Sequence, residues 1–299
     1  MESKTGFIAI VGKPNVGKSS LLNALLGEKI AIVTSKPQTT RTKITGVLTR
    51  GEKQYVFIDT PGLHKARTKL GDNMVKAVNT SLRDIDLVLL VVEPTGAIKQ
   101  AELDLIQAIK TQHLPAVLII NKIDLLPDKD AIMKRIAEFS GLHTFDAVIP
   151  ISVAQEDGLD LVFDELDKHL VESVHFFPDD TLTDQPERVI VAERIREKIL
   201  LNMQQEIPHG TAVVIEKMKE REDKDIIDID ATIYCERATH KGMLIGKGGR
   251  VLKKIASEAR ADIENFLDCK VNLQCWIKVK EDWRNKDGLI NNFGLSFKE

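Results

Sequence analysis

The sequence predicts two domains: an α/β domain with a doubly wound, mainly parallel sheet, followed by a smaller α+β domain. In the first part of the 299-residue chain, strand-like and helix-like runs alternate, and the strand-like runs are rich in Val, Ile and Leu. Such runs are typical of parallel strands that helices cover on both faces. A stretch rich in Pro and Asp interrupts this alternation, and the order then becomes α-β-β-α-α-β. We therefore expect domains at 1–172 and 187–299, joined by a linker at 173–186.

The hydrophobic periodicity predicts the individual elements. In the first domain, strands are expected at 7–11, 44–48, 55–59, 87–92, 117–121 and 148–152, and helices at 19–26, 70–83, 100–111, 130–139 and 159–170. In the second, helices are expected at 187–205 and 249–266, and strands at 211–217, 226–234 and 270–279, with a charged hairpin at 219–225. Ligands of doubly wound sheets bind beyond the carboxyl ends of the strands, and the motifs described below fall at such ends.

The composition is that of a globular protein, with 43% apolar and 29% charged residues and a net charge of −3. No apolar run approaches the roughly 20 residues that span a membrane. The polar residues 1–5 do not resemble a signal peptide. The three cysteines cannot all pair, and their spacing fits no zinc pattern, so we expect buried free thiols in a reducing cytoplasm.

A glycine-rich loop follows the first predicted strand and opens the first predicted helix. In this context the pattern G-x-x-x-x-G-K-[ST] predicts a phosphate-binding loop, because its backbone N–H groups and the helix N-terminus attract phosphate. Lys18 is expected to reach the β- and γ-phosphates, and Ser19 to bind Mg²⁺. A structural glycine turn is the alternative, and two later motifs argue against it. The expected contacts are Gly12, Lys13, Pro14, Asn15, Val16, Gly17, Lys18, Ser19 and Ser20.

Two further motifs follow predicted strands. The first is Asp59-Thr60-Pro61-Gly62, in which Asp59 is expected to hold Mg²⁺ through water and the Gly62 N–H to contact the γ-phosphate. The second is Asn121-Lys122-Ile123-Asp124. A carboxylate there accepts from the two adjacent N–H donors of guanine, a pair that adenine lacks, and the lysine stem covers the base. The three motifs together predict GTP binding.

With these motifs, the chain resembles the translation-factor-like class of GTPases. The resemblance implies a guanine-contacting loop, which Ser152-Val153-Ala154 matches, although Val153 stands where Ala is usual. It also implies a switch threonine on Mg²⁺. Thr39 and Thr40 are both candidates, and Thr40 is preferred because it precedes Arg41; an ordinary polar loop is the alternative.

Hydrolysis is expected to be slow. Leu63 follows Gly62 where many GTPases carry a water-positioning Gln, and leucine cannot orient water. His64 is either a base or an ordinary loop histidine. Asn15 stands where potassium-activated relatives carry a cation-binding Asn, which suggests K⁺ stimulation. The candidate catalytic residues are Lys18, Thr40 and Asn15.

The second domain contains a Gly-x-x-Gly loop before its last long helix. This pattern, in the order α-β-β-α-α-β, predicts a KH domain, which clamps about four nucleotides of single-stranded RNA or DNA. A helix cap and a second phosphate loop are the alternatives. Residues 237–254 hold six basic side chains and no acidic one. The candidate RNA contacts are Ile245, Gly246, Lys247, Gly248, Gly249, Arg250, Lys253 and Lys254.

Two apolar features of this domain allow two interpretations each. The first is a set of apolar side chains around the loop, which either line a groove for bases or belong to the core: Ile245, Val251 and Ile255. The aromatic tail at 280–299, which includes Trp283 and Phe293, stacks on bases or packs on the domain.

The two domains together, with Phe177-Pro178-Asp179-Asp180 between them, make the whole chain similar to the bacterial Era family of GTPases. The resemblance implies binding to the 3′ end of small-subunit ribosomal RNA and a role in maturing that subunit. It also implies a cytoplasmic protein with some peripheral membrane association, and we expect a monomer. Two functions are open: a GTP-driven switch that binds and releases RNA, or a GTPase that acts on a membrane or an RNA-modification factor, with the KH domain as a passive tether.

Overall fold

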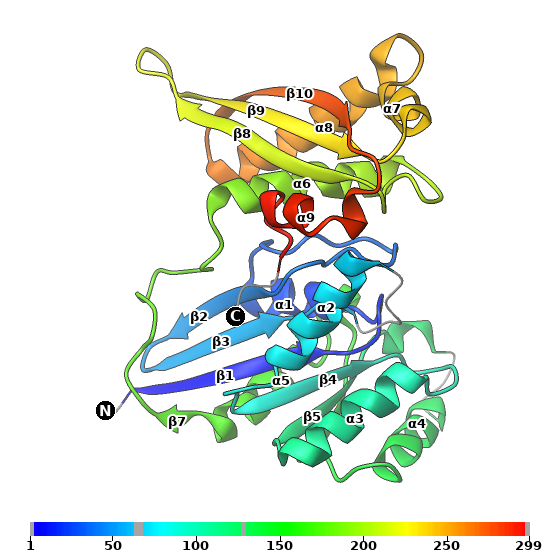
Figure 1. Ribbon diagram of the computed structural model, residues 1–299. Coiled ribbons are helices and arrows are strands. Elements are labelled where there is room, and N and C mark those ends of the chain that lie inside the picture. Colours follow the sequence, from blue (N-terminus) through cyan, green and yellow to red (C-terminus); the bar gives the residue numbers. More distant parts are fainter. Residues whose placement is uncertain (1–2, 63–67, 127–129, 297–299) are drawn as a thin grey trace. The chain divides into compact units, whose positions relative to one another are not determined.

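The computed structural model describes residues 3–62, 68–126 and 130–296, which form two compact units (Figure 1). The first unit contains most of the chain up to Asp184. The second begins at Gln185 and also includes two short earlier segments, Ile32–Thr39 and residues 68–72. Each unit has its own hydrophobic core.

The first unit is built on one mixed sheet with the order β2-β3-β1-β4-β5-β6, and β7 pairs with β1. β2 is antiparallel to β3 and β7 is antiparallel to β1, whereas the other pairs are parallel. The predicted doubly wound, mainly parallel sheet is confirmed. The strands are β1 (Lys4–Val11), β2 (Ile44–Arg50), β3 (Lys53–Asp59), β4 (Leu87–Val92), β5 (Ala116–Ile120), β6 (Ala147–Pro150) and β7 (Val171–Glu172).

Helices cover both faces of this sheet (Figure 1). α1 and α5 contribute to the core on one face, and α2, α3 and α4 to the core on the other. The helices are α1 (Lys18–Leu26), α2 (Lys69–Thr80), α3 (Gln100–Gln112), α4 (Asp130–Ser140) and α5 (Leu159–Leu166), with short 3₁₀ turns at Ile123–Leu125, Val153–Gln155 and Asp167–His169.

Two helices of the first unit are shorter than predicted. α2 ends at Thr80 rather than at 83, and Asp84 soon after it has a left-handed φ of 54°. α5 ends at Leu166 rather than at 170, because a 3₁₀ turn follows and Leu170 is already extended. In both cases the hydrophobic pattern continues into the connection, so periodicity alone overestimates the helix.

The second unit is a three-stranded sheet, order β10-β9-β8, with β10 parallel and β8 antiparallel to β9. Helices α6, α7 and α8 share a core with one face of it, which confirms the predicted α+β order. The elements are α6 (Glu187–Asn202), β8 (Ala212–Glu220), β9 (Ile226–Cys235), α7 (Ala238–Ile245), α8 (Arg250–Leu267), β10 (Lys270–Val279) and α9 (Asp287–Asn292), with 3₁₀ turns at Lys247–Gly249 and Trp283–Asn285.

Some boundaries of the second unit differ from prediction. α6 ends at Asn202 rather than at 205, because Met203 is extended and Gln205 has a left-handed φ of 56°. β8 continues to Glu220, so the connection to β9 begins two residues later than the predicted hairpin at 219–225. The sequence pattern does not predict helix α9.

The C-terminal tail packs on the domain, which decides between the two interpretations that the sequence allows. Trp283 is fully buried, and its Nε1 donates to the Gly210 carbonyl at 2.9 Å. Phe293 stacks on Tyr234 with ring centroids 4.5 Å apart. Trp283 is therefore a core residue and presents no face to a base.

The structure agrees only in part with the expectation of buried free thiols. Cys235, Cys269 and Cys275 are free thiols; Cys235 is buried and the other two are half-buried. Burial raises the pKa of Cys275 to about 12, so its thiol stays protonated and unreactive. Among the described residues, no helix is both long and apolar enough to cross a bilayer.

Candidate functional site

The glycine-rich loop joins β1 to α1, and two of its glycines are enclosed by the rest of the first unit. A Cβ at Gly12 would lie 2.3 Å from the Val91 carbonyl oxygen. A Cβ at Gly17 would lie 2.2 Å from Asn121 Nδ2, and Gly17 also has a φ of 101°. Since both distances are far below van der Waals contact, only glycine fits at either position. The rest of the first unit therefore packs closely against this loop.

Lys18 places its ammonium inside this loop. Its Nζ donates to the carbonyls of Gly12 and Lys13, each at 3.1 Å. Burial lowers the pKa of Lys18 to about 8, although the nearby Asp59 carboxylate acts in the opposite direction. An ammonium held in a desolvated loop interacts strongly with an incoming phosphate.

Three oxygen-bearing side chains converge beside the loop. Ser19 Oγ donates to Asp59 Oδ2 at 2.6 Å and lies 2.8 Å from Thr40 Oγ1. Burial raises the pKa of Asp59 to about 6, against the opposing effects of Lys18 and of the Ser19 hydrogen bond. A carboxylate and two hydroxyls suit Mg²⁺, which prefers oxygen and takes only a few protein ligands. The residues present therefore fit the ion.

The structure distinguishes the two threonine candidates. Thr40 contacts Ser19, as described above, whereas Thr39 Oγ1 bonds to Thr34 Oγ1 and to the Lys36 carbonyl, each at 2.7 Å. Of the two, Thr40 is therefore the one that joins the Ser19–Asp59 cluster. Thr60, next to Asp59, bonds to the Ile10 carbonyl at 2.9 Å and ties the end of β3 to β1.

The expected guanine-binding residues meet at the ends of β5 and β6. Asn121 Nδ2 donates to the Val16 carbonyl at 2.9 Å, and its Oδ1 accepts from the Val153 N–H at 3.1 Å. Ser152 Oγ donates to Asp124 Oδ1 at 2.6 Å, which fixes one carboxylate oxygen. Asn121 thus connects the phosphate loop to the segment that contains Ser152, Val153 and Ala154.

Pro61 and Gly62 complete the described part of the site. A Cβ at Gly62 would lie 2.7 Å from Pro14 Cα, so the glycine lets the two loops come together. Leu63 and His64 lie outside the described residues.

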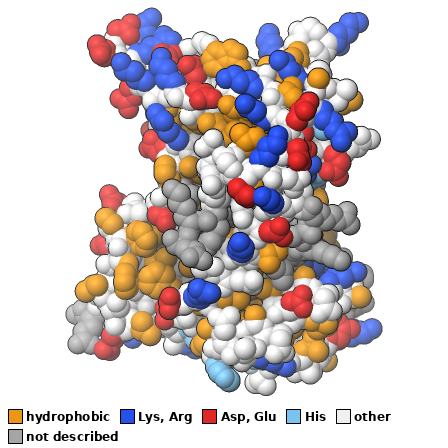
Figure 2. All heavy atoms as spheres, in the orientation of Figure 1, with side chains coloured by type: hydrophobic (Ala, Val, Ile, Leu, Met, Phe, Trp, Pro, Cys, Tyr) orange, Lys and Arg blue, Asp and Glu red, His pale blue; other side chains and the backbone are white. Residues whose placement is uncertain are grey.

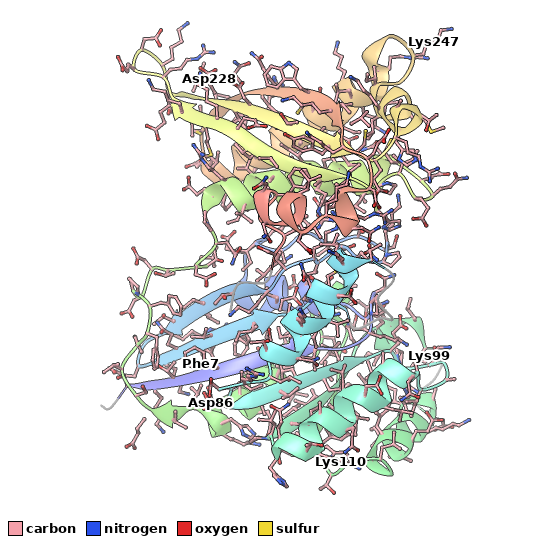
Figure 3. All side chains as sticks on the ribbon, in the orientation of Figure 1. Phe7, Asp86, Lys99, Lys110, Asp228 and Lys247 are labelled. Carbon is pink, nitrogen blue, oxygen red and sulfur yellow. The ribbon has the colours of Figure 1, made fainter. Side chains whose placement is uncertain are left out.

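The Gly-x-x-Gly loop has a different environment. Gly246 ends α7, and a Cβ there would lie 2.5 Å from Val251 Cγ2. Gly248 and Gly249 have φ values of 63° and 77°, and a Cβ at either position would meet no atom within 4 Å. Figure 3 shows Lys247 at the outer end of this loop. The loop thus presents open backbone to the solvent.

The basic candidates beside this loop are accessible. Lys247, Arg250, Lys253 and Lys254 are exposed, and Lys254 forms a 3.7 Å ion pair with Glu258. Ile255 is fully buried and belongs to the core, whereas Ile245 and Val251 are half-buried beside it. Of these three apolar residues, Ile245 and Val251 therefore have surface that a base could contact.

Two protein-family models match separate parts of this chain. A family model described as "50S ribosome-binding GTPase" matches residues 7–122, and a KH domain model matches residues 206–284. GTPase Era of Ruminiclostridium cellulolyticum is 49% identical over 294 residues, 98% of each chain. GTPase Era of Clostridioides difficile is 49% identical over 295 residues, 99% of each chain. The chain belongs to the Era family of GTPases.

Solved Era structures resemble it closely. A variant of Aquifex aeolicus Era bound to GDP·AlF4⁻ superposes with a TM-score of 0.95 at 35% identity and covers 98% of this chain and 100% of its own. An Era structure in complex with MgGDPNP and nucleotides 1506–1542 of 16S ribosomal RNA has the same TM-score and identity, and covers 99% and 100%. The Era fold therefore extends over the full chain.

Sequence reasoning missed one side chain beside the phosphate loop, Glu93 after β4. Its carboxylate lies 3.0 Å from Lys13 Nζ and 2.8 Å from Lys122 Nζ, and Lys122 Nζ also donates to the Asn15 carbonyl at 2.6 Å. Burial alone would raise the pKa of Glu93, but hydrogen bonds from the two lysines outweigh it and lower the pKa. A single acidic residue after a strand forms no motif, so the sequence offered no specific signal for Glu93.

Proposed function

We propose that this protein hydrolyses GTP with Mg²⁺ and binds the single-stranded 3′ end of small-subunit ribosomal RNA during assembly of that subunit. The observation that carries the proposal is the full-length similarity to an Era bound to both MgGDPNP and 16S ribosomal RNA nucleotides 1506–1542. The phosphate loop, the guanine-binding segments and the Gly-x-x-Gly loop of this chain supply the matching elements.

The side chains of the first unit have separate tasks in this proposal. Lys18 neutralises β- and γ-phosphate charge, and the Gly62 N–H donates to the γ-phosphate. Ser19, Thr40 and Asp59 would hold Mg²⁺, which when bound stabilises the negative charge on the phosphates. The 2.6 Å and 2.8 Å contacts among these three groups support the assignment.

Guanine selectivity depends on Asp124. Its carboxylate accepts from N1–H and the exocyclic amine of guanine, and the Ser152 hydroxyl at 2.6 Å holds it in place. Adenine cannot supply this donor pair, so with ATP the carboxylate would lack the two hydrogen bonds that guanine donates. The aliphatic stem of Lys122 covers the base plane.

We also propose that K⁺ stimulates turnover through Asn15. A monovalent cation beside the phosphates would stabilise the transition-state charge as an arginine finger does. Asn15 has a left-handed φ of 67° and its carbonyl is fixed by Lys122. Turnover is expected to be faster in KCl than in NaCl at equal ionic strength, and identical rates would contradict the role of K⁺.

Two measurements on the full chain test the main proposal. Phosphate release should be detectable from GTP but not from ATP, and should disappear in Lys18→Ala. A labelled RNA with the 3′-terminal sequence of 16S ribosomal RNA should bind more tightly than a scrambled RNA of equal length. Hydrolysis of ATP at a similar rate would overturn the assignment of Asp124, and equal binding of both RNAs would overturn the RNA target.

The membrane contact that the family implies would be peripheral, and sedimentation with anionic vesicles tests it.

A further inference from the structure

A buried arginine of the first unit belongs to none of the motifs described above. Figure 2 shows Lys and Arg side chains at the surface, where such side chains usually lie. Arg135 of α4 is instead only 2% exposed, and its guanidinium lies 4.6 Å over the Phe139 ring. Burial of a permanently charged group costs free energy unless partners compensate for it, so the contacts of Arg135 indicate what it does.

Two contacts of Arg135 hold the main chain that follows β4. Its Nε donates to the Glu93 carbonyl at 3.0 Å, and its Nη1 donates to the Gly96 carbonyl at 2.9 Å. Because the guanidinium is planar, the two bonds fix the two carbonyls relative to each other. Arg135 thus orients the segment from which the Glu93 side chain reaches its two lysines.

The remaining nitrogen of Arg135, Nη2, faces a second acidic residue. It lies 3.9 Å from Oε1 of Glu102, which is 0% exposed. The other carboxylate oxygen of Glu102 accepts from the N–H of Lys99, which Figure 3 labels, at 2.8 Å. Among the residues that the structure describes, neither Nη2 nor Oε1 has a hydrogen-bond partner. The two groups therefore interact as a buried pair of opposite charges.

Glu102 also lies beside a lysine of the phosphate loop. Lys13 Nζ is 3.9 Å from Glu102 Oε1 and 3.0 Å from Glu93 Oε2. The Lys13 ammonium thus lies between two carboxylates and is closer to that of Glu93. Since the Lys13 carbonyl accepts from Lys18 Nζ at 3.1 Å, a displacement of Lys13 reaches the ammonium that is expected to bind phosphate.

We infer that Arg135 is a positioning residue for the phosphate loop, because it neutralises Glu102 and so leaves Lys13 paired with Glu93. This inference rests on the proposed binding of GTP by this loop. Without Arg135, Lys13 is the cation that remains beside Glu102 among the described side chains. A carboxylate attracts an ammonium strongly where water is excluded. Lys13 would therefore shift from Glu93 toward Glu102 and displace its own main chain.

The first test is the GTP affinity of Arg135→Met, measured on the full chain with a fluorescent GTP analogue. Methionine keeps apolar contact with Phe139 but has no charge. Affinity should fall by about tenfold, as expected when a buried charged group loses its partner. The loss should not depend on salt, because Arg135 and Glu102 are shielded from solvent.

The two ways in which this test can fail are distinguishable. Wild-type affinity in Arg135→Met would overturn the positioning role. A wild-type protein that does not bind GTP would instead overturn the proposed function.

Two double variants test whether the effect depends on Glu102 and Lys13. Glu102→Gln removes the charge but keeps an acceptor for the Lys99 N–H, so its combination with Arg135→Met should recover most of the lost affinity. In a Lys13→Met background, Arg135→Met should cause little further loss. A purely structural role of Arg135 predicts the same loss in every background, and that result would contradict the inference.

Arg194→Met is the matched control. Arg194 is 5% exposed, lies 4.6 Å over the Phe266 ring and pairs with Asp262 in the second unit. Its replacement removes a similar buried ion pair and should leave GTP affinity unchanged; an equal fall in both variants would refute a specific role for Arg135.

A second variant is available if Arg135→Met does not fold. Arg135→Lys keeps a positive charge beside Glu102 but loses the planar fork that holds two carbonyls. Its GTP affinity should fall by about threefold, which is a smaller loss than that of Arg135→Met. Wild-type affinity in Arg135→Lys would exclude a contribution from the bonds to Glu93 and Gly96.

Discussion

The two glycine-rich loops of this protein use glycine for different physical reasons. In the phosphate loop, the positions of Gly12 and Gly17 are filled to within 2.3 Å by Val91 and Asn121. In the Gly-x-x-Gly loop, Gly248 and Gly249 have left-handed backbones but open space around them. The phosphate loop is thus closely packed against the rest of its own domain. The other loop leaves room for a ligand's backbone to approach.

This contrast predicts how the two loops respond to mutation. Substitution in the phosphate loop must disturb neighbouring side chains, including those expected to bind the base. Substitution at Gly248 or Gly249 meets no neighbouring atom, so apart from backbone strain it changes only what the solvent or an RNA meets. Four substitutions test this difference, beginning with the largest expected effect.

Gly17→Ala should have the largest effect. The new methyl group would displace the amide of Asn121, which bonds to Val16 and Val153. Losing two buried hydrogen bonds at about 1–3 kcal/mol each predicts a fall in GTP affinity of about a hundredfold or more. Titration with a fluorescent GTP analogue measures this, and RNA binding should be unchanged. A GTP affinity close to that of the wild-type protein would refute the enclosed-loop interpretation.

Gly248→Asp should show the reverse pattern. The new carboxylate repels RNA phosphate, and aspartate tolerates the left-handed backbone better than most residues. RNA affinity should fall by about tenfold, with GTP affinity unchanged. Gly248→Asn, with the same shape but no charge, is the control and should lose less. A loss of GTP binding instead would show that the KH assignment is wrong.

Ser152→Ala should have an intermediate effect on the nucleotide site. It removes the 2.6 Å bond to Asp124, so the carboxylate is less well oriented toward guanine. The loss of one hydrogen bond to a charged group predicts about a tenfold weaker affinity for GTP and GDP alike. Ser81→Ala, which removes a 2.8 Å bond to the Ala77 carbonyl in α2, serves as a control with no expected change. Unchanged nucleotide affinity in Ser152→Ala would mean that Asp124 needs no support.

Glu93→Gln should have the smallest effect. It removes the charge between Lys13 and Lys122, but all three groups are partly solvent-exposed, so the interaction is screened. We expect GTP affinity to fall by about two- to threefold, and less at high salt. Nucleotide titrations at two ionic strengths measure the loss of GTP affinity and its dependence on salt. A large loss that is independent of salt would indicate a structural role for the carboxylate instead.

The sequence predicted which side chains of the first unit converge because each motif follows a strand end, and parallel strands bring such ends together. The motifs identified Lys18, Asp59 and Asn121, and this rule predicted that they lie close together. The sequence did not predict Glu93, because a single acidic residue carries no pattern. Its position becomes informative only when β4 brings it beside two lysines.

In the second unit, the sequence did not predict which aromatic side chains are exposed. The alternation over 270–279 was visible, but the sequence could not show which face the tail covers. Trp283 was a candidate for stacking and is buried, whereas Trp276 lies on the exposed face. Which tryptophan is accessible depends on the docking of α9, a tertiary contact without a local signal.

One titration distinguishes most directly between a GTP-driven switch and a GTPase with a passive KH tether. It titrates labelled 16S 3′-end RNA with the full chain, saturated either with a non-hydrolysable GTP analogue or with GDP, both with Mg²⁺. If the nucleotide state controls RNA binding, the two affinities must differ, and RNA must change the affinity for the two nucleotides by the same ratio. We predict tighter RNA binding in the GTP-analogue state. Equal affinities would contradict the switch and favour the KH domain as a passive tether.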